Sequence, residues 1–484
     1  MSSSQQQRGR GGQFSIQVIF FSAIAVIMIT GFLVLVLTFV QLSVRAYNKN
    51  VAFSISEAGI EYYRWHLAHA STDYQDGTGQ AGPYIHDFFD KDGNKIGQFI
   101  LDITPPSFGS TVVKVRSTGK VVADSSVSRI IEVRLGQPTL AQYALVGNAS
   151  MAIGAGVVTY GPVFGNSGIH FDGYANNLVQ SAITSYKDPD HAGANEYAVH
   201  THVSSTDPLP TSTLPNRPDV FGAGRSFPAA AVDFAAITQN LANIKSLAQA
   251  SGTYFGSSTV FGYDLVFSPS STYSVYKVTS LAAVPSSGCV NVFLGIAGWG
   301  TWSIGTETLF ATGTTPAVGV MFFEDNLWVR GQINGSRVTV GSGRFPDNVN
   351  TRANIIVNTN LLYSRYDGSD AIGLVTQNNF NIGLFSDDSI RIDATLVAQY
   401  GRAGRYYYLP ADQFNTNCDI YATRNALTLY GMIVTNKRYG FGYADGTGYV
   451  NRSLIYDENL LYNPPVVFPT TSQQYVQLTW DEVQ

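Results

Sequence analysis

The stretch VIFFSAIAVIMITGFLVLVLTFV, residues 18–40, is soon followed by NVAFSISEAGIEYYRW, residues 50–65. The first stretch carries no charge, and as a helix it would be about 35 Å long, which is enough to cross the hydrocarbon core of a bilayer. In the second stretch, apolar and small residues recur at steps of three and four, and no proline precedes Pro83. The pattern therefore predicts one uninterrupted helix over residues 13–69, which spans a membrane in its first half.

A cleaved secretory signal is the alternative interpretation of this segment. Its apolar region would be about 7–15 residues long, which is shorter than the run observed here, so we expect a retained helix. Basic residues lie on both sides of the run and do not discriminate between the two orientations. The polar character of the remainder and its few cysteines favour a cytoplasmic leader, residues 1–12, and a large C-terminal part at the cell surface.

The composition indicates a mostly β protein beyond the helix. Only 13% of residues are charged, and the chain holds 47 glycines, 28 tyrosines and 28 phenylalanines, which suit strands and tight turns. The formal net charge of -5 argues against nucleic acid as a partner, because such binding requires a basic surface. The two cysteines, Cys289 and Cys418, are a candidate disulfide, although their spacing alone leaves two free thiols equally open.

Residues 52–58, AFSISEA, resemble the segment that follows the membrane helix in PilX-type minor pilins, where the pattern is Ala-Phe-x-x-Ala-Glu-Ala. Ser56 stands where that family often has alanine. The resemblance implies assembly of neighbouring stems through this part of the helix. The residues expected to take part in stem assembly are Ala52, Phe53, Glu57, Ala58 and Gly59.

The leader RGRGG, residues 8–12, is similar to the basic leader of type IV prepilins, which ends in glycine. Cleavage after Gly12 would make Gln13 the first mature residue and Gln17 the fifth. The family has phenylalanine and glutamate at these two positions, so the chain departs from the pattern at both. The resemblance still implies prepilin-type processing at this site.

Beyond the helix, the pattern of apolar, polar and turn-forming residues divides the chain into three parts. Residues 70–83 are turn-rich and are expected to be a linker, and residues 84–137 alternate between apolar and polar as a small antiparallel β-domain does. Residues 138–484 hold short apolar segments that are broken by Gly and Asn, which favours a large β-solenoid resembling a right-handed β-helix. No strict repeat is visible, and a β-sandwich stays open. A loop and one helix are expected to interrupt the solenoid at residues 205–250.

This large part also resembles the ectodomains of uncharacterised pilin-like membrane proteins from candidate-phyla bacteria. The resemblance lies in GPVFGNSGIHFDG, residues 161–173, and DPDHAGANEYAVHTHV, residues 188–203. It implies a surface location and brings no activity.

Four of the seven histidines lie within these two segments: His170, His191, His200 and His202. A His-x-His pair on a strand places both rings on one face, and that spacing can chelate zinc or copper. The predicted metal ligands are His200 and His202, then His170, with oxygen available from Asp172, Asp188 and Asp190. The alternative is that these side chains are hydrogen-bonded to nearby turns.

The segment SDDSIRID contains Asp387, Asp388, Arg391 and Asp393. Polysaccharide-cleaving enzymes on β-helices use grouped carboxylates, which makes these residues the alternative hypothesis of a membrane-tethered carbohydrate-acting enzyme. No nucleophile elbow, phosphate-binding loop or dinucleotide fingerprint occurs, and we expect no cofactor.

These observations together predict a non-enzymatic, membrane-anchored, pilin-like surface protein. It would be a minor pilin or a tip adhesin of a type IV pilus-like assembly. The expected partners are the membrane, other pilin-like subunits and a surface glycan or other cell-surface ligand. A static envelope anchor protein is a further alternative, and leader processing separates it from the first hypothesis.

Overall fold

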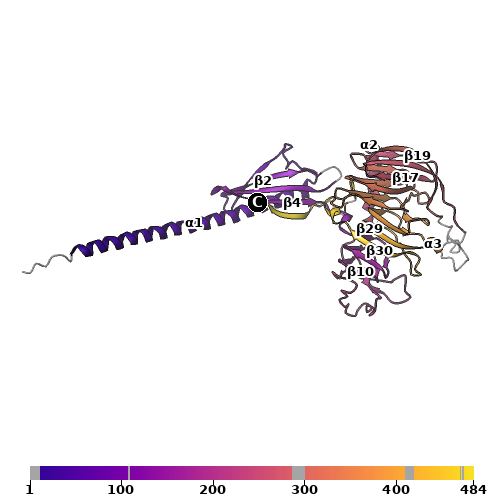
Figure 1. The fold of residues 1–484 in the computed structure, drawn as a ribbon, viewed down its shortest axis with the longest axis horizontal. Helices are drawn as coiled ribbons and strands as arrows, with labels where there is room; N and C mark the ends of the chain where they lie inside the picture. Colours follow the sequence, from indigo (N-terminus) through magenta and orange to yellow (C-terminus); the bar gives the residue numbers. More distant parts are fainter. Residues whose placement is uncertain are drawn as a thin grey trace, which may run out of the picture. The chain divides into compact units, whose positions relative to one another are not determined.

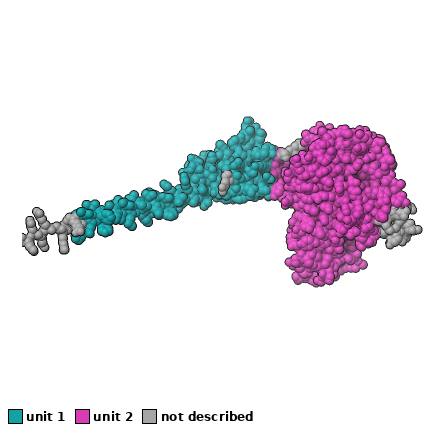
Figure 2. All heavy atoms as spheres, in the orientation of Figure 1, with its two compact units in different colours: residues 1–105, 113–135, 477–484 teal, residues 106–112, 136–476 magenta. Residues whose placement is uncertain are grey.

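The computed structural model describes residues 11–106, 110–285, 300–408, 419–468, 470 and 474–483. These residues form two compact units, which Figure 2 shows in different colours. The stem unit comprises residues up to 105, residues 113–135 and residues from 477 onward. The large unit comprises residues 106–112 and 136–476. Cys289 and Cys418, the candidate disulfide, both lie outside the described residues.

One long helix begins the stem unit, as the sequence predicts. Helix α1 runs without interruption over Gly11–His69, and among the described residues it is the helix that is long and apolar enough to cross a membrane. Its side chains are exposed from Phe14 to Tyr47, and burial starts at Asn48. The hydroxyls of Ser22, Thr30 and Thr38 each donate to the carbonyl oxygen four residues earlier, at 2.6 to 2.8 Å. These three hydroxyls are therefore satisfied within the helix and can lie in an apolar surrounding.

The second half of α1 packs on an antiparallel sheet whose strands alternate between buried and exposed side chains. The sheet order is β1-β2-β3-β4-β31, and the chain's C-terminus lies beside β4 (Figure 1). Turn Asp90–Asn94 joins β1 to β2, and residues 122–123 join β3 to β4. The strands are β1 Tyr84–Phe89, β2 Lys95–Thr104, β3 Val113–Val121, β4 Asp124–Gly136 and β31 Val476–Val483.

The fifth strand corrects the predicted organisation. Residues 138–484 were expected to form one domain, but β31 hydrogen-bonds to β4 in the stem unit. The ion pair between Arg129 of β4 and Glu482 of β31 supports this pairing, and Trp480 of β31 contacts Phe53 of α1 with ring centroids 6.0 Å apart. The chain thus returns to its first unit at its end.

The large unit is dominated by parallel strand pairing. Ten strands form one continuous parallel ladder in the order β16-β20-β22-β25-β27-β29-β5-β8-β11-β15. Parallel pairing disfavours the β-sandwich, whose sheets are antiparallel. The strands are β16 Thr253–Phe255, β20 Val320–Phe323, β22 Arg337–Ser342, β25 Ala371–Thr376, β27 Ser389–Ala398, β29 Thr423–Thr435, β5 Leu145–Gly147, β8 Val163–Gly165, β11 Val179–Ser181 and β15 Arg225–Ser226.

The order along this ladder is not the order along the chain. The first strand, β5, pairs with β29 in the interior of the ladder, and the chain then proceeds through β8 and β11 to β15 at one end. After helix α2, Phe234–Ala250, it resumes at β16 at the opposite end and returns strand by strand to β29. The predicted interruption at 205–250 therefore contains α2, and also the short strand β15.

Other parallel ladders run through the same strands and their neighbours. One joins β21, β24, β27, β29, β30, β7 and β10, one joins β21, β23, β26 and β28, and a separate sheet has the order β14-β9-β6. Antiparallel strands β18 and β19 extend β17, which pairs with β21. The strands are β17 Gly262–Ser268, β18 Thr272–Leu281, β19 Ile304–Thr314, β21 Leu327–Ile333, β24 Leu361–Tyr363, β30 Gly448–Tyr456, β7 Val157–Tyr160, β10 Tyr174–Ala175, β23 Ile355–Ile356, β26 Phe380–Ile382, β28 Ala403–Arg405, β14 Val199–His200, β9 Ile169–Phe171 and β6 Met151–Ile153.

Both faces of the ten-strand ladder are apolar. Alternate residues such as Leu374 and Leu396 belong to an interior cluster, whereas Val375 and Val397 belong to a second cluster that also contains Leu241 and Ile244 of α2. Helix α2 therefore covers one face of the ladder, which explains why β20 and β25 are buried throughout instead of alternating. The remaining short elements are β12 Ser185–Tyr186, β13 Glu196–Tyr197, α3 Asp419–Ala422, and 3-10 turns at Leu140–Gln142 and Glu458–Leu461.

Candidate metal centre and other predicted sites

The histidines converge on one face of the β14-β9-β6 sheet. Strands β9 and β14 pair in parallel register with His170 opposite His200, and the two rings stack with centroids 5.0 Å apart. The neighbours of His170 along β9, Ile169 and Phe171, point into the interior apolar cluster. Because side chains alternate along a strand, His170 points to the opposite face.

A hairpin contributes the acidic residues of the same cluster. Strands β12 and β13 pair antiparallel, with Tyr186 opposite Glu196, and the loop between them carries Asp188 and His191. Asp188 and His200 are 3% and 2% exposed, so the centre of the cluster is dry. Gly168 admits this packing, because a Cβ there would lie 2.1 Å from the Tyr186 ring.

The nitrogen and oxygen atoms at the centre of the cluster are close together. Oδ2 of Asp188 lies 3.1 Å from Nδ1 of His170, 3.3 Å from Nδ1 of His191 and 3.4 Å from Nε2 of His200. The second carboxylate, Glu196, places Oε2 3.0 Å from Nε2 of His200 and Oε1 2.7 Å from Nε2 of His202. In several groups of three, including His170 with Asp188 and His200, all potential ligand atoms lie within 4.8 Å of one another.

The outer nitrogens of two of these rings are held by hydrogen bonds. Nε2 of His170 contacts Oδ2 of Asp172 at 2.9 Å, and Nδ1 of His200 contacts the carbonyl oxygen of Tyr197 at 3.0 Å. The other oxygen of Asp172 accepts from the Thr201 hydroxyl and from the backbone N–H of His202. Each ring thus has one nitrogen fixed from behind and the other directed into the cluster.

Electrostatics differ among the members of the cluster. Burial lowers the pKa of His170, but the hydrogen bond to Asp172 and the charges of the nearby aspartates outweigh it, and the net pKa lies above its usual value. Burial holds the pKa of His200 below its usual value. Although burial opposes it, the hydrogen bonds from His170 and His202 lower the pKa of Asp172. Burial, together with the charges of Asp188 and Glu196, raises the pKa of the Tyr186 hydroxyl.

The structure brings together the three predicted ligands, His170, His200 and His202, although His202 lies just beyond the end of β14. Of the three aspartates proposed as oxygen donors, Asp188 is central. Asp172 supports His170 from behind, and Asp190 instead forms an ion pair with Arg438.

Two members of the cluster were not among the ligands predicted from the sequence. His191 belonged to the histidine group without being ranked as a ligand, and Glu196 was not considered. In the sequence, only the spacing of four residues between Glu196 and His200 could have indicated that Glu196 belongs to the site. In a segment of short strands, that spacing does not determine whether the two side chains lie close together.

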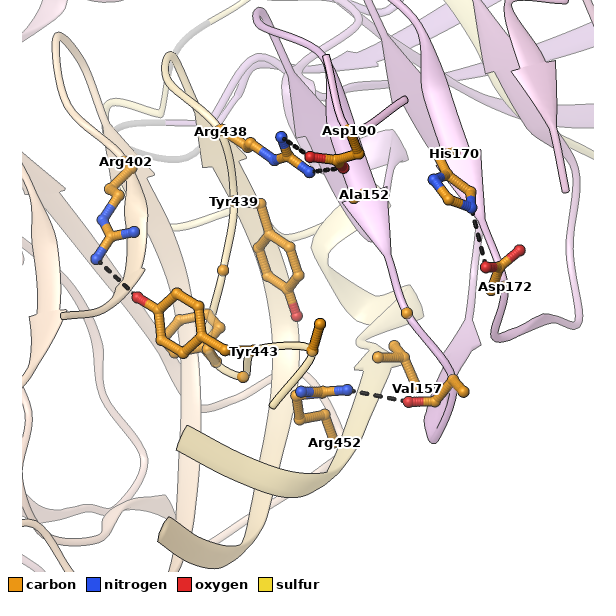
Figure 3. A pocket seen from close by; sticks show the side chains of 16 residues that line it. Ala152, Val157, His170, Asp172, Asp190, Arg402, Arg438, Tyr439, Tyr443 and Arg452 are labelled. Atoms are coloured by element: carbon orange, nitrogen blue, oxygen red, sulfur yellow. Dashed lines mark hydrogen bonds and ion pairs between the residues drawn. The ribbon is translucent and has the colours of Figure 1, made fainter. Parts of the chain in front are cut away.

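A cavity of about 850 Å³ lies next to the cluster. Figure 3 shows its walls: the His170–Asp172 pair on one side, and the Arg438–Asp190 pair with Tyr439 on another. Arg402, Tyr443 and Arg452 complete the polar lining. The centre of the cluster is therefore buried, and the His170 side chain forms part of the cavity wall.

The predicted stem-assembly residues divide into two groups. Ala52 is fully buried, and a Cβ on Gly59 would lie 2.3 Å from the Ser117 hydroxyl, so both residues face the chain's own sheet. Phe53 is partly buried against Trp480, Ala58 is partly buried, and Glu57 is exposed. The close approach that Ala52 and Gly59 permit is thus used within the chain.

The predicted cleavage site lies at the start of the helix. Gly12 and Gln13 are in the first turn of α1, and Gln17 is exposed one turn later. The described residues begin at 11, so they do not report on the rest of the leader.

The three acidic residues of the enzyme hypothesis have different environments. Asp387 and Asp388 are exposed, whereas Asp393 is fully buried. The Asp393 carboxylate accepts hydrogen bonds from Arg391, from the Tyr366 hydroxyl and from the backbone N–H of Tyr363. A carboxylate with these fixed donors acts as a structural acceptor, and its burial separates its environment from that of Asp387 and Asp388.

Comparison with known proteins identifies no family. No protein-family model matches the chain, and no curated protein matches it. Among solved structures, the chain is similar to the competence-associated pilin ComZ from Thermus thermophilus, with 11% identity, a TM-score of 0.28, and coverage of 90% of this chain and 98% of that one. A TM-score this low does not establish a shared fold, so function is argued below from this chain's own residues.

Proposed function

We propose that the protein is a membrane-anchored, pilin-like surface protein whose stem is α1. The observation that carries this proposal is the change of environment along one continuous helix. Up to Tyr47 its side chains, mostly large and apolar, are exposed, and from Asn48 onward the helix is packed on the antiparallel sheet of its own unit. Water-exposed apolar surface of this extent is strongly unfavourable, and a bilayer would cover it.

The orientation rests on the composition of the residues that follow α1, which are rich in polar side chains and hold few cysteines. Residues 136–476 fold into one compact unit, and α1 leads out of the membrane directly into the stem sheet. We place this C-terminal part at the cell surface, with the short leader in the cytoplasm.

The large unit favours a minor or tip position over a repeated subunit. Packed helices lie about 8–10 Å apart, whereas a body of the size of residues 136–476 has a radius of gyration of roughly 20 Å. Such a body on every subunit would crowd neighbouring stems. A single copy, or a few copies, at the end of an assembly avoids this conflict.

The same unit supports a solenoid as the finer description of its fold. Several parallel ladders share strands β21, β27 and β29. Apart from the steps from β29 to β5 and from β30 to β7, each ladder step adds one strand from a later stretch of chain. We take these ladders as the faces of a β-helix, and right-handed connections are expected for parallel crossovers. Antiparallel strands β18 and β19 would then cover one side of its β16–β17 end.

The test is the intact mass and N-terminal sequence of the full chain purified from its native membrane. Prepilin-type processing gives a mature start at Gln13 and supports assembly with other pilin-like subunits. A start at Met1 or Ser2 rejects the pilin-like role and leaves the static envelope anchor. Recovery of the chain in the soluble fraction rejects membrane anchoring as well.

A further inference from the structure

We propose that the large unit holds one divalent transition-metal ion of the zinc class, bound by Nδ1 of His170, Oδ2 of Asp188 and Nε2 of His200. The fourth ligand is Oε2 of Glu196. This inference concerns the large unit alone and does not depend on the membrane-anchor proposal.

The first argument is the set of buried atoms that lack a hydrogen bond. His170 Nδ1, Asp188 Oδ2, Glu196 Oε2 and His200 Nε2 are all buried, and none has a hydrogen-bond partner within the described residues. Leaving four such atoms unsatisfied in one place would be costly. The ligand atoms of His170, Asp188 and His200 lie within 4.8 Å of one another, and Oε2 of Glu196 lies 3.0 Å from Nε2 of His200, so we assign the four atoms to one shared ion.

The second argument is the tautomer of each ring. An ionised Asp172 and a backbone carbonyl can only accept hydrogen bonds, so Nε2 of His170 and Nδ1 of His200 carry the protons. In the neutral rings the opposite nitrogens present lone pairs. These two nitrogens lie 3.1 and 3.4 Å from Oδ2 of Asp188, an arrangement of acceptors that a cation between them stabilises.

Extra protons explain the arrangement less well than a metal ion does. Nδ1 of His170 and Oδ2 of Asp188 are 3.1 Å apart, yet they do not have the alignment of a hydrogen bond. A proton on this nitrogen would point away from the carboxylate oxygen, whereas ligands of a common ion point at the ion and not at each other. Two ligands about 2.1 Å from a tetrahedral zinc lie about 3.4 Å apart, close to the observed separations.

The third argument is the support behind the ligands. Metal-binding histidines typically donate their other ring N–H to a carboxylate or a backbone carbonyl, which fixes the ring and raises its basicity. His170 has the first kind of partner in Asp172, and His200 has the second kind in Tyr197. The mixture of imidazole and carboxylate ligands selects a zinc-class ion over calcium or magnesium, which prefer all-oxygen sites.

The position of the site assigns it a structural role. Asp188 and Glu196 belong to the β12–β13 hairpin, whereas His170 and His200 belong to the sheet beneath it. One ion would therefore tie the hairpin loop, residues 187–195, onto the sheet. Four protein ligands with a nearly dry centre are typical of a closed structural site.

The experiment uses the full chain in detergent, purified with a histidine-free tag and dialysed against a chelator. Zinc is then added, bound metal is measured by elemental mass spectrometry, and unfolding is followed by scanning calorimetry. The variants are His200→Ala and Asp188→Asn, and the matched control is His69→Ala, an exposed histidine of the stem unit.

Wild type and His69→Ala should bind one zinc per chain and gain roughly 5 °C or more in the midpoint of the large unit's transition. Both site variants should lose the bound zinc and the gain. Asp188→Asn keeps the side-chain shape, so its loss separates metal binding from misfolding. In wild type, metal removal should also speed tryptic cleavage after the exposed Lys187.

The proposal is overturned if chelated wild type takes up no zinc, or if Asp188→Asn takes up as much zinc as wild type. It is equally overturned if zinc binds without changing either the unfolding midpoint or the cleavage rate, because the site is assigned a structural role.

Discussion

Gly119 of β3 lies directly against Ala52 of α1: a Cβ at Gly119 would be 2.0 Å from the Ala52 carbonyl oxygen and 2.7 Å from the Ser56 backbone nitrogen. Both neighbours are backbone atoms of a continuous helix, so neither can rotate away. The contact sets how closely the stem helix approaches its sheet. Because glycine has no side chain, the hydrophobic pattern of the sequence does not predict this contact.

Gly119→Ala should therefore destabilise the stem unit by roughly 1–3 kcal/mol, because overpacking at a backbone contact forces helix and sheet apart. The measurement is the free energy of unfolding of the stem unit, followed by hydrogen exchange of β2 and β3. Gly31→Ala is the control, since a Cβ there meets nothing within 4 Å. Equal exchange rates in the two variants would contradict the assigned contact.

The double variant Ile29→Arg with Leu33→Arg should weaken membrane anchoring. Each arginine at the centre of a membrane helix costs about 2.5–3.5 kcal/mol on insertion scales. The share of chain that alkaline carbonate extracts from membranes should rise. Ser54→Arg with Ala68→Arg adds the same charge at exposed positions of α1 beyond the apolar run, and it should leave extraction unchanged. Identical extraction of the two double variants would argue against a spanning helix.

Glu57→Gln should impair assembly without altering folding. Glu57 is exposed, and it forms no ion pair with any described residue, which leaves its charge available to a neighbouring stem. A surface change of this kind alters stability by less than about 0.5 kcal/mol. Cross-linking to other pilin-like subunits in native membranes should drop. Glu61→Gln is the control, because Glu61 is already paired with Arg64 at 2.6 Å. If cross-linking of Glu61→Gln fell as much as that of Glu57→Gln, Glu57 would have no specific role in assembly.

Sequence patterns predicted the helices and strands that are determined by neighbouring residues along the chain. The helix over residues 13–69 could be read from the uncharged run and the three-to-four periodicity, and the structure places it at Gly11–His69. The strands of residues 84–137 were equally readable from alternation. Pairing between distant segments was not. Nothing near Trp480 signals that β31 joins β4, and nothing near β5 signals that it pairs with β29.

The histidine cluster shows the same division. The spacing of His200 and His202 drew attention to the site, but the parallel register that sets His170 opposite His200 joins residues thirty positions apart. Glu196 reaches the cluster through a hairpin whose strands are two residues long, too short for an alternation to be seen. The small residues Ala52 and Gly59 predicted a helix face that packs closely against a partner. The sequence did not indicate that this partner is the chain's own sheet.

A buried carboxyl group in the large unit, with a partly exposed carboxylate beside it, predicts an unusual pH dependence. Asp264 is fully buried beside Glu307 and Arg330, and Nε of Arg330 donates to its Oδ2 at 2.9 Å. Burial raises the pKa of Asp264 to about 7; the Arg330 charge opposes the shift and the neighbouring Glu307 adds to it. Its folded-state pKa is thus above the unfolded value, so protonation stabilises the folded state. The resulting contribution is complete below about pH 4 and is lost as the pH rises through 7.

Asp264→Asn should remove this dependence, because the amide keeps an acceptor for Arg330 and never ionises beside Glu307. The free energy of unfolding, obtained from thermal unfolding, should exceed that of wild type at pH 8, and this advantage should shrink by on the order of 2–4 kcal/mol between pH 8 and pH 5. Asp367→Asn is the control: hydrogen bonds from Ser369 lower the pKa of that exposed carboxyl, so its contribution changes only in more acidic solution. Curves for Asp264→Asn and wild type that stay parallel from pH 5 to 8 would show that Asp264 is ionised throughout, with Arg330 outweighing its burial.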